Sequence, residues 1–342
     1  MNKICAIFNL RNHLPFGRAL KHFGWCDVYY TPFTKKATGQ AVPDKEINKL
    51  NINFKKYDVL LLQHERQPDQ YAAFFAKRQN PRIVVIGNQH GFYKSILEIK
   101  DRPPNDFDYW NVWGKYWLDR SKKILDKTPK KWINLGSFLH DYYFQTKKWN
   151  PKKTNKKALV IYEPNAHESY QSKVRDIHSQ GMRLIFKALK ELKMPYDIKA
   201  HPLWPHLKGN DGTKMWTPPK KMKDFDIERI INYSLILGCR STVLLDAIAM
   251  RMPVVGTNSF SEWEDDHYGP AEKKLFPYAN TKNELKKLIT KYFNHKIDYS
   301  KSKIKYFLGD LGKVSKNYYQ FCEQASQRKK RFIKIPLIGR LL

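Results

Sequence analysis

Residues 81–94 read Pro81-Arg82-Ile83-Val84-Val85-Ile86-Gly87-Asn88-Gln89-His90-Gly91-Phe92-Tyr93-Lys94. The apolar, β-branched run at 82–86 is typical of a buried strand. Polar residues and a glycine follow it directly. Open α/β sheets bind ligands at the carboxyl ends of their strands. The stretch therefore predicts a buried parallel strand whose end carries a binding site around His90.

Outward from this strand, apolar runs of strand length alternate with helical patterns. In the first half we expect strands at 3–10, 26–30, 58–63, 82–86, 108–112 and 132–136, with helices at 14–23, 70–78 and 115–125. In the second half we expect strands at 158–162, 196–200, 234–238 and 253–256, with helices at 174–192, 225–232, 241–250 and 282–293. Strands separated by helix-length segments predict parallel sheets, because parallel strands need long crossovers. The predicted fold class is α/β, with two Rossmann-like parallel-sheet domains facing an interdomain cleft.

The length of 342 residues favours two domains, since single cores stop growing near this size. We expect a first domain at 1–145 and a second domain at 158–309. The polar, lysine-rich segment 146–157 is predicted to be a linker. Residues 310–342 are predicted to form a helix that returns to the first domain, followed by a basic tail.

The formal net charge is +31, and lysine and arginine are spread along the whole chain. Such a charge favours an anionic partner: lipid headgroups, nucleic acid or phosphorylated substrates. The alternative is a lysine-rich surface that serves solubility alone. The four cysteines are widely spaced, which indicates reduced thiols. With no convincing signal peptide and no apolar run long enough to span a bilayer, we expect a cytoplasmic protein.

His90 is the first candidate catalytic residue, because an imidazole can accept a proton from a hydroxyl near neutral pH. Gly91 beside it lets a ligand approach the backbone closely. The alternative is a histidine that only bonds a neighbouring loop. Glu65, just after the strand at 58–63, is a second candidate general base. Gln89 and Lys94 complete the predicted acceptor side.

The second half carries candidate donor-binding residues at three strand ends. Lys199 and His201 lie at one, where Pro202 fixes the backbone and the imidazole suits a leaving phosphate. Glu163 lies at another and suits a sugar or base; the alternatives are an ordinary turn at each place. The third strand runs through Gly238 into Cys239-Arg240-Ser241-Thr242.

Ser241 is suited to cap the helix at 241–250, whose first amides and dipole attract anions. Arg240 and Thr242 add a cation and a hydroxyl beside it, and Asp246 lies about one turn further, within reach of a ribose. The alternative is a capped core helix with an exposed aspartate. Phosphate-binding loops, dinucleotide fingerprints, zinc motifs and serine-hydrolase elbows are absent from the sequence, and no motif requires a metal or another cofactor.

These residues resemble GT-B glycosyltransferase-like enzymes of bacterial surface-polysaccharide assembly. The nearest pattern is the CDP-glycerol glycerophosphotransferase family, and the capsule enzymes that use CMP-linked sialic acid or Kdo are similar in layout. The likeness covers about residues 55–256 through short motifs. These are His90-Gly91 with Lys94, Trp113-Gly114-Lys115, Leu135-Gly136-Ser137, Tyr162-Glu163-Pro164, His201-Pro202 and Ser241-Thr242.

The resemblance implies catalysis by His90, and phosphate binding by His201 with the Ser241-Thr242 turn. It also implies a CMP- or CDP-linked donor, since a cytidine nucleotide is common to both groups. The sequence departs from the first group at Leu203, where an arginine is usual, and at Gly238-Cys239-Arg240, which replaces an aspartate-containing turn. It departs from the second at Gln89-His90, where an acidic pair is usual.

The carboxyl terminus combines the basic run Arg328-Lys329-Lys330-Arg331 with an apolar tail. This combination suits an anionic membrane surface; the alternative is docking on the protein's own core. The sequence predicts a transferase at the inner face of the plasma membrane. It would move a sugar or polyol-phosphate from a nucleotide-activated donor to a surface polysaccharide or lipid-linked glycan. The rivals are a nucleic-acid-binding protein and an inactive glycan-binding scaffold.

Overall fold

The computed structural model describes residues 3–8, 14–30, 51–63, 67–89, 107–125, 132–162, 172–200, 227–239, 241–257, 270 and 273–334. The chain divides into two compact units. Unit 1 consists of Met1–Tyr142 and Lys305–Leu342, and unit 2 of Tyr143–Ile304. The chain thus enters unit 2 within one helix, α6 (Phe138–Thr146), and leaves it within another, α11 (Lys301–Leu308).

Unit 1 contains a six-stranded parallel sheet in the order β2-β1-β3-β4-β5-β6. Its strands are β1 (Ile4–Phe8), β2 (Asp27–Tyr30), β3 (Val59–Leu62), β4 (Val84–Asn88), β5 (Tyr109–Val112) and β6 (Trp132–Asn134). The central strands β1, β3 and β4 are buried along their whole length, as their continuous apolar sequences predict. Gly87 is required in β4, because a Cβ there would lie 2.3 Å from the ring of Trp110 on β5.

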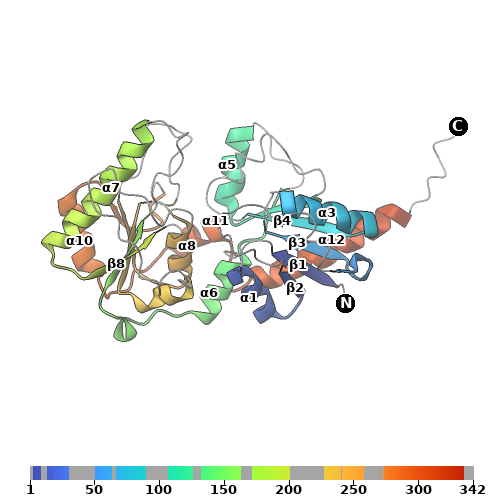
Figure 1. The fold of residues 1–342 in the computed structure, drawn as a ribbon, viewed down its shortest axis with the longest axis horizontal. Helices are drawn as coiled ribbons and strands as arrows, with labels where there is room; N and C mark the ends of the chain where they lie inside the picture. Colours follow the sequence, from blue (N-terminus) through green and yellow to red (C-terminus); the bar gives the residue numbers. More distant parts are fainter. Residues whose placement is uncertain are drawn as a thin grey trace. The chain divides into compact units, whose positions relative to one another are not determined.

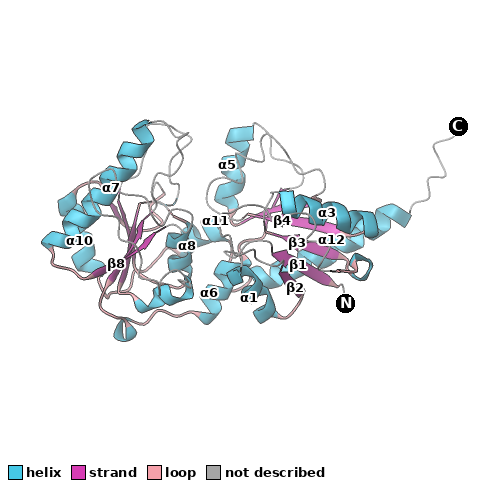
Figure 2. Cartoon of the chain, viewed as in Figure 1, coloured by secondary structure: helices cyan, strands magenta, loops and turns pink. Residues whose placement is uncertain are grey.

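Helices join these strands, as Figure 2 shows with strands in magenta and helices in cyan. They are α1 (Leu14–Phe23), α3 (Gln67–Gln79), α5 (Lys115–Leu125), α6 and, from the other end of the chain, α12 (Val314–Lys334). A 3-10 helix, η2 (Phe54–Lys56), precedes β3. Helix α6 was not expected, since its aromatic-rich sequence has no clear apolar stripe. Ser137 stabilises its first turn, where the Oγ accepts a hydrogen bond from the amide of His140 at 3.3 Å.

Helix α12 packs on the sheet of unit 1 (Figure 1). Phe321 stacks edge-on against Tyr109 of β5, with 5.0 Å between ring centroids. Further along the helix, the Lys329 ammonium donates to the carbonyl of Ile83 at 2.6 Å and to both carboxylate oxygens of Asp108, at 3.0 and 2.9 Å.

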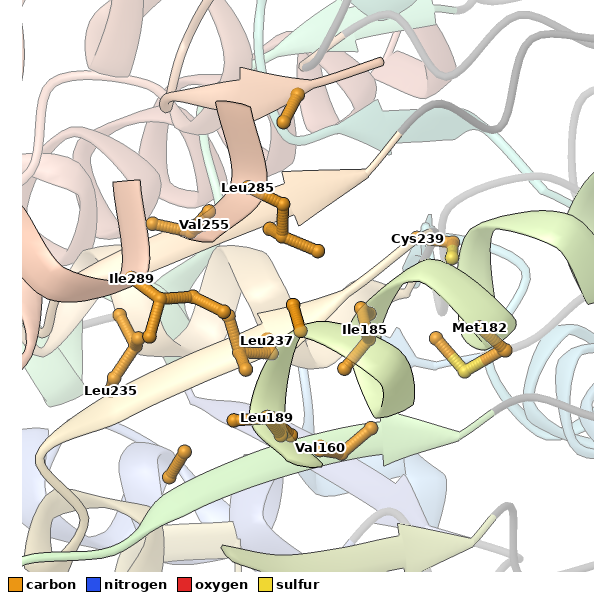
Figure 3. Close-up of a cluster of buried hydrophobic side chains, with 13 residues drawn as sticks. Val160, Met182, Ile185, Leu189, Leu235, Leu237, Cys239, Val255, Leu285 and Ile289 are labelled. Atoms are coloured by element: carbon orange, nitrogen blue, oxygen red, sulfur yellow. The ribbon is translucent and has the colours of Figure 1, made fainter. Parts of the chain in front are cut away.

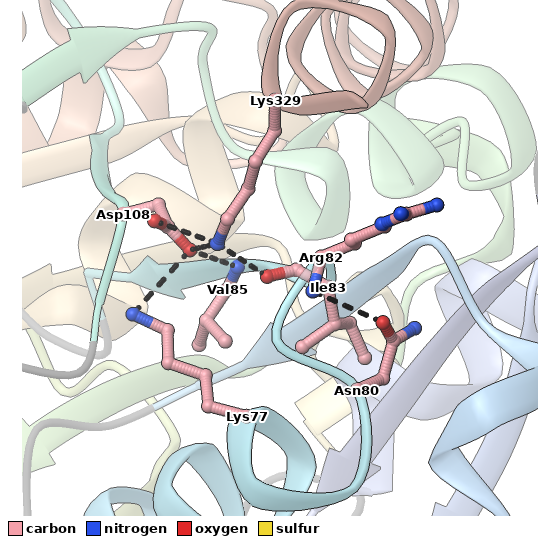
Figure 4. A network of polar contacts seen from close by, with 7 residues as sticks. All are labelled: Lys77, Asn80, Arg82, Ile83, Val85, Asp108 and Lys329. Carbon is pink, nitrogen blue, oxygen red and sulfur yellow. Dashed lines mark hydrogen bonds and ion pairs between the residues drawn. The ribbon is translucent and has the colours of Figure 1, made fainter. Parts of the chain in front are cut away.

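The Asp108 carboxylate forms several hydrogen bonds and ion pairs just before the start of β5 (Figure 4). Its carboxylate also accepts from the amide of Val85 at 2.9 Å and lies 3.6 Å from the ammonium of Lys77. Lys329 is one of the basic residues that the sequence predicts to face a membrane. Its ammonium instead binds Ile83 and Asp108 within unit 1. The apolar tail at 335–342 lies outside the described residues.

Unit 2 contains a five-stranded parallel sheet in the order β11-β10-β9-β7-β8. Its strands are β7 (Ala158–Tyr162), β8 (Tyr196–Ala200), β9 (Leu235–Gly238), β10 (Val254–Thr257) and β11 (Tyr278–Ala279). Read from β8 and numbered in chain order within the unit, these strands have the order 2-1-3-4-5. The first five strands of unit 1 have the same order. Both sheets are parallel throughout, as the sequence predicted.

Two helices, α7 (Ser172–Glu191) and α10 (Lys282–Tyr292), cover one face of this sheet. Figure 3 shows their buried side chains, among them Ile185, Leu189 and Leu285, against alternate residues of the strands. Helix α8 (Thr242–Ala249) covers the opposite face, where Leu244 packs on Gly238. The 3-10 helices η3 (Pro151–Lys153) and η5 (Ile227–Asn232) complete the unit.

The segment 146–157, predicted to be a linker, packs on unit 2. Trp149 is buried, its indole N–H donates to the carbonyl of Tyr233 at 2.8 Å, and its amide donates to that of Met250 at 3.2 Å. The Thr154 hydroxyl lies 2.8 Å from the Ser234 hydroxyl. A polar composition suggested a solvated linker, but one buried tryptophan is enough to fix the segment. Among the described helices, none combines the length and apolar content needed to cross a membrane.

Candidate functional site

The carboxyl edge of the unit 2 sheet holds Ser241 and Thr242 at a defined topological position. Strand β7 lies between β8 and β9, and the chain passes from it first to β8 on one side and then to β9 on the other. The loops after β7 and β9 therefore diverge at this point, where doubly wound sheets bind their ligands. Ser241 follows β9 after Cys239 and Arg240, and Thr242 is the first residue of α8.

Ser241 is the N-cap of α8. Its backbone is extended (φ −168°, ψ 149°), and its Oγ accepts a hydrogen bond from the amide of Val243 at 3.2 Å. The residue is 4% exposed, whereas Thr242 is half-buried. The capped first turn directs the positive end of the helix dipole towards the carboxyl edge of the sheet, an arrangement that attracts phosphate.

Small residues bring the backbone close together at this edge. A Cβ at Gly238 would lie 3.1 Å from Leu244 of α8, so a larger residue would push the helix away from the strand. Cys239 is buried, and its Sγ lies 2.9 Å from the Oγ1 of Thr257 at the end of β10. These contacts fix the ends of β9 and β10 next to the helix cap.

Two other predicted donor residues lie in described elements of unit 2. Asp246 occupies the second turn of α8 and is only 6% exposed, in contrast to the exposed aspartate considered from the sequence. Lys199 is half-buried on the edge strand β8, opposite Ile161 of β7. Arg240, Glu163 and His201 lie outside the described residues, although each directly follows a described residue or strand at the same edge.

The carboxyl edge of unit 1 is filled by buried amide side chains. Asn111 on β5 donates to the Asn88 Oδ1 at 3.2 Å and to the Gly136 carbonyl at 2.9 Å, and its own Oδ1 accepts from the amide of Leu135 at 2.9 Å. The Asn88 amide donates in turn to the Leu62 carbonyl at 2.9 Å. We call Gln63, Asn88, Gln89 and Asn111 the amide layer; it bridges β3, β4, β5 and β6.

Helix α12 joins the amide layer through Tyr318, whose hydroxyl donates to the Asn88 Oδ1 at 2.6 Å. Burial raises the pKa of the Tyr318 phenol well above its usual value, so the hydroxyl keeps its proton and remains a donor. A buried hydrogen-bond network of this kind rigidifies the elements that it connects. Within the amide layer, the Gln63 Oε1 is the one buried side-chain oxygen that has no hydrogen-bond partner among the described residues.

Within the amide layer, Gln89 is the residue that directly precedes the candidate catalytic residue His90 in the sequence. Its Oε1 accepts from the Trp113 amide at 3.1 Å, and its backbone carbonyl accepts from the Trp113 indole at 2.9 Å and from the Gln63 side chain at 3.1 Å. The sequence predicts Gln89 on the acceptor side of the site. In the structure its side chain is 1% exposed and contacts Trp113. It holds the backbone one residue before His90.

His90, Gly91, Lys94 and Glu65 lie outside the described residues. The sequence reasoning overlooked Asn88, Asn111 and Gln63, although a usable signal exists. Each amide residue lies within or directly after a buried apolar strand, where an unexplained polar side chain indicates a buried network. Among the described residues, no three His, Cys, Asp or Glu side chains are grouped as a metal site requires.

Comparison with known proteins gives no family model and no curated protein that matches the chain. Solved structures do match. The UDP-GlcNAc 2-epimerase from Methanocaldococcus jannaschii is 15% identical, with a TM-score of 0.54, over 93% of this chain and 99% of that one. The wall teichoic acid polymerase TagF, in a variant soaked with CDPG, is 12% identical, with a TM-score of 0.56, over 96% of this chain and 90% of that one. The S. aureus MnaA–UDP structure is 12% identical, with a TM-score of 0.52 over 94% and 98% of the two chains.

At these identities the likeness concerns the fold. The matched structures include enzymes solved with UDP-GlcNAc, UDP and CDPG. The fold class predicted from the sequence is confirmed in its architecture: this chain has a GT-B-like fold built from two parallel-sheet α/β units.

Proposed function

We propose that the protein is a transferase that moves a sugar or polyol-phosphate from a nucleotide-activated donor, CMP- or CDP-linked, to a surface polysaccharide or lipid-linked glycan. The observation that carries the proposal is the Ser241-capped helix at the switch point of unit 2. A helix cap beside close-packed glycine backbone provides amides for a phosphate where doubly wound sheets bind ligands.

In this proposal the donor phosphates bind at the amino end of α8. Ser241 and Thr242 hold the helix end, and Arg240, His201 and Lys199 supply positive charge. Asp246 binds a ribose hydroxyl, which requires its buried carboxylate to line the nucleotide site, and Glu163 contacts the sugar or base. The main contribution to catalysis is stabilisation of the negative charge that develops on the leaving phosphate.

His90 is the proposed general base, with Glu65 as the second candidate. The imidazole takes the proton from the acceptor hydroxyl, whose oxygen attacks the donor atom while the bond from that atom to the nucleotide breaks. The amide layer, which includes Gln89, supports this role because it fixes the strand end that directly precedes His90. Gly91 and Lys94 are proposed to contact the acceptor. The predicted cleft between the domains stays a prediction.

A thermal-shift screen of CMP, CDP, UDP, GDP and ADP tests the donor. A ligand present at about 100 times its dissociation constant stabilises the native state by about 2.7 kcal/mol, which raises the melting temperature of a chain this size by about 4 °C. We expect this shift with CMP or CDP. Stabilisation by UDP alone would instead favour chemistry on a UDP-sugar, as in the epimerase whose fold this chain shares.

Binding and turnover measurements on this protein distinguish the proposed transferase from the two rival functions. A nucleic-acid-binding protein would show DNA or RNA affinity that falls steeply with salt, because cationic contacts release counterions. An inactive scaffold would bind glycan and never consume a donor. Release of CMP or CDP from a supplied donor, dependent on acceptor, is the expected outcome, and we propose that it occurs at the inner face of the plasma membrane.

A further inference from the structure

We propose that unit 2 binds anionic membranes through the outward surface of α7 and α10, at a place separate from the nucleotide edge. We call this the α7–α10 surface and define it by six exposed cationic side chains: Arg183, Lys187, Lys190, Lys193, Lys287 and Lys291. Figure 1 shows the two helices next to each other on one side of the unit.

The charge of this surface is almost uncompensated. Residues 183–196 and 281–293 contain only two carboxylates, and both are engaged. Glu191 binds Lys282 and also accepts from the Lys286 ammonium at 2.8 Å. The Glu284 carboxylate accepts from the amides of Asn280 and Thr281 at 3.0 and 3.2 Å, as part of the α10 capping box. The exposed cations therefore give this surface a net positive potential.

The same surface carries apolar side chains between the lysines. An open hollow of about 340 Å³ lies where α7 ends and β8 begins. Phe186, Leu189, Met194 and Tyr196 form its apolar lining, and Lys187, Lys190 and Lys193 border it. Tyr196 is 38% exposed, with its ring centroid 5.8 Å from that of Phe186.

A second hollow of about 450 Å³ adjoins the same chain segment. Leu192 contributes its apolar surface, and Lys286, Lys287 and Lys291 contribute positive charge. Lysines that alternate with partly exposed apolar groups suit the headgroup region of a bilayer. There the ammonium groups meet lipid phosphates and the apolar groups reach the acyl boundary. This mixture favours a membrane over single-stranded nucleic acid, whose binding proteins combine a cationic groove with aromatic stacking platforms. Duplex DNA, which binds to surface cations alone, is included in the test below.

The position of the surface leaves the nucleotide edge free. The hollow at Tyr196 lies at the amino end of β8, whereas Ser241 follows the carboxyl end of β9. Since these strands are parallel, the two places lie at opposite edges of one sheet. Membrane binding by this surface does not depend on the proposed function. Its benefit rests on the proposed function, because membrane binding would keep the enzyme near a lipid-linked acceptor.

Co-sedimentation of the full chain with vesicles tests the surface directly and needs no donor. The vesicles contain either phosphatidylcholine alone or equal parts of phosphatidylcholine and phosphatidylglycerol. We expect binding only to the anionic vesicles, weakened by added salt. Reversal of three lysines, K187E/K190E/K193E, should lower the vesicle binding constant by at least about 100-fold, since each lysine contributes near an anionic surface.

The matched control reverses three exposed lysines elsewhere in unit 2, K152E/K153E/K301E, and changes the net charge equally. The vesicle binding constant of this control should fall by less than a tenth of the factor seen with K187E/K190E/K193E. Both triple variants should keep a melting temperature within a few degrees of the wild type. A further variant, M194S/Y196S, should remove the binding that remains at high salt.

Equal losses in the two triple variants would overturn the proposal, because general charge would then explain binding. Unchanged vesicle binding in K187E/K190E/K193E, with loss only after removal of residues 335–342, would overturn it in favour of the tail. Loss of duplex DNA affinity without loss of vesicle affinity would likewise overturn it. The nucleotide screen reads out the proposed function separately, so the failure of one leaves the other measurable.

Discussion

The carboxyl edges of the two sheets differ although the sheets share one strand order. In unit 1 the edge is filled by the amide layer, with Asn88 and Asn111 paired to each other and to backbone groups on both sides. In unit 2 the corresponding edge has Gly238, the Cys239–Thr257 contact and a serine-capped helix. One edge is built from side-chain amides, and the other from close-packed backbone and a helix end.

Under the proposed function, the two edges have different tasks within one architecture. Buried amides orient a strand end rigidly, which suits a residue that must hold one position for proton transfer. A glycine strand end followed by a helix cap presents amides and positive potential, which suits a phosphate. The shared topology supplies the position of each site, and the local residues supply its chemistry.

Replacement of His90 by alanine tests the division most strongly. We expect His90→Ala to lower the rate of transfer by about 10²- to 10⁴-fold, the usual contribution of a general base, because the acceptor hydroxyl loses its proton acceptor. The melting-temperature shift with CMP or CDP should persist, since the proposed nucleotide site lies on unit 2. Transfer rates are measured by nucleotide release. Wild-type activity in this variant would show that unit 1 does not supply the base from this strand end.

Asn111→Leu tests whether the amide layer holds unit 1 together. The near-isosteric change leaves the Leu135 amide and the Gly136 carbonyl without their buried partner. We expect a loss of about 3 kcal/mol in the free energy of unfolding, measured by urea denaturation. The matched change on the other edge is Thr257→Val, which removes only a contact with Cys239 and should cost about 1 kcal/mol or less. Similar losses at the two edges would contradict the contrast between them.

Ser241→Ala probes the helix end of unit 2. Loss of the cap should cost about 1 kcal/mol of stability and weaken CMP or CDP binding by about 10-fold, as the first turn of α8 loosens. Thr281→Ala is the control, because it removes the N-cap of α10 in the same unit. It should cost a similar amount of stability and leave nucleotide affinity unchanged. Nucleotide affinity is measured by calorimetry, and equal effects of the two variants would remove the special role of α8.

Glu191→Gln should have the smallest effect on stability, since the carboxylate is exposed. Hydrogen bonds from the ammonium groups of Lys282 and Lys286 lower the pKa of Glu191 to about 2 from its usual value near 4.5. Its contribution is therefore present above pH 4.5 and declines as the pH falls towards 2. Urea denaturation at pH 7 and pH 3 should show the difference between the wild type and the variant shrinking in acid.

The same substitution should raise affinity for anionic vesicles, because it releases two lysines and removes one negative charge. Decreased vesicle binding by Glu191→Gln would count against the α7–α10 surface.

Much of the fold follows from local patterns. Buried strands such as β3, β4 and β7 are continuous apolar runs, and the Ser241 cap is visible in the sequence as a serine between a strand and an apolar helix. Helix α6 was not predicted because its aromatic residues do not form an apolar stripe along one helix face. The packing of the segment 146–157 was not predicted either, because it depends on hydrogen bonds from Trp149 to Tyr233 and Met250, which are distant in the sequence.

The sequence by itself determined the α/β class, the parallel sheets and the candidate residues at the strand ends, because these depend on periodicity and on residues adjacent in the chain. Only the tertiary structure decided the amide layer, the pairing of Lys329 with Asp108 and the neighbours of the exposed lysines. The Asn88–Tyr318 hydrogen bond joins residues 230 positions apart, and the Lys329–Asp108 contacts join residues 221 apart. Hydrogen bonds and ion pairs across such separations form only once the apolar sheets have brought the chain together, so no local pattern encodes their partners.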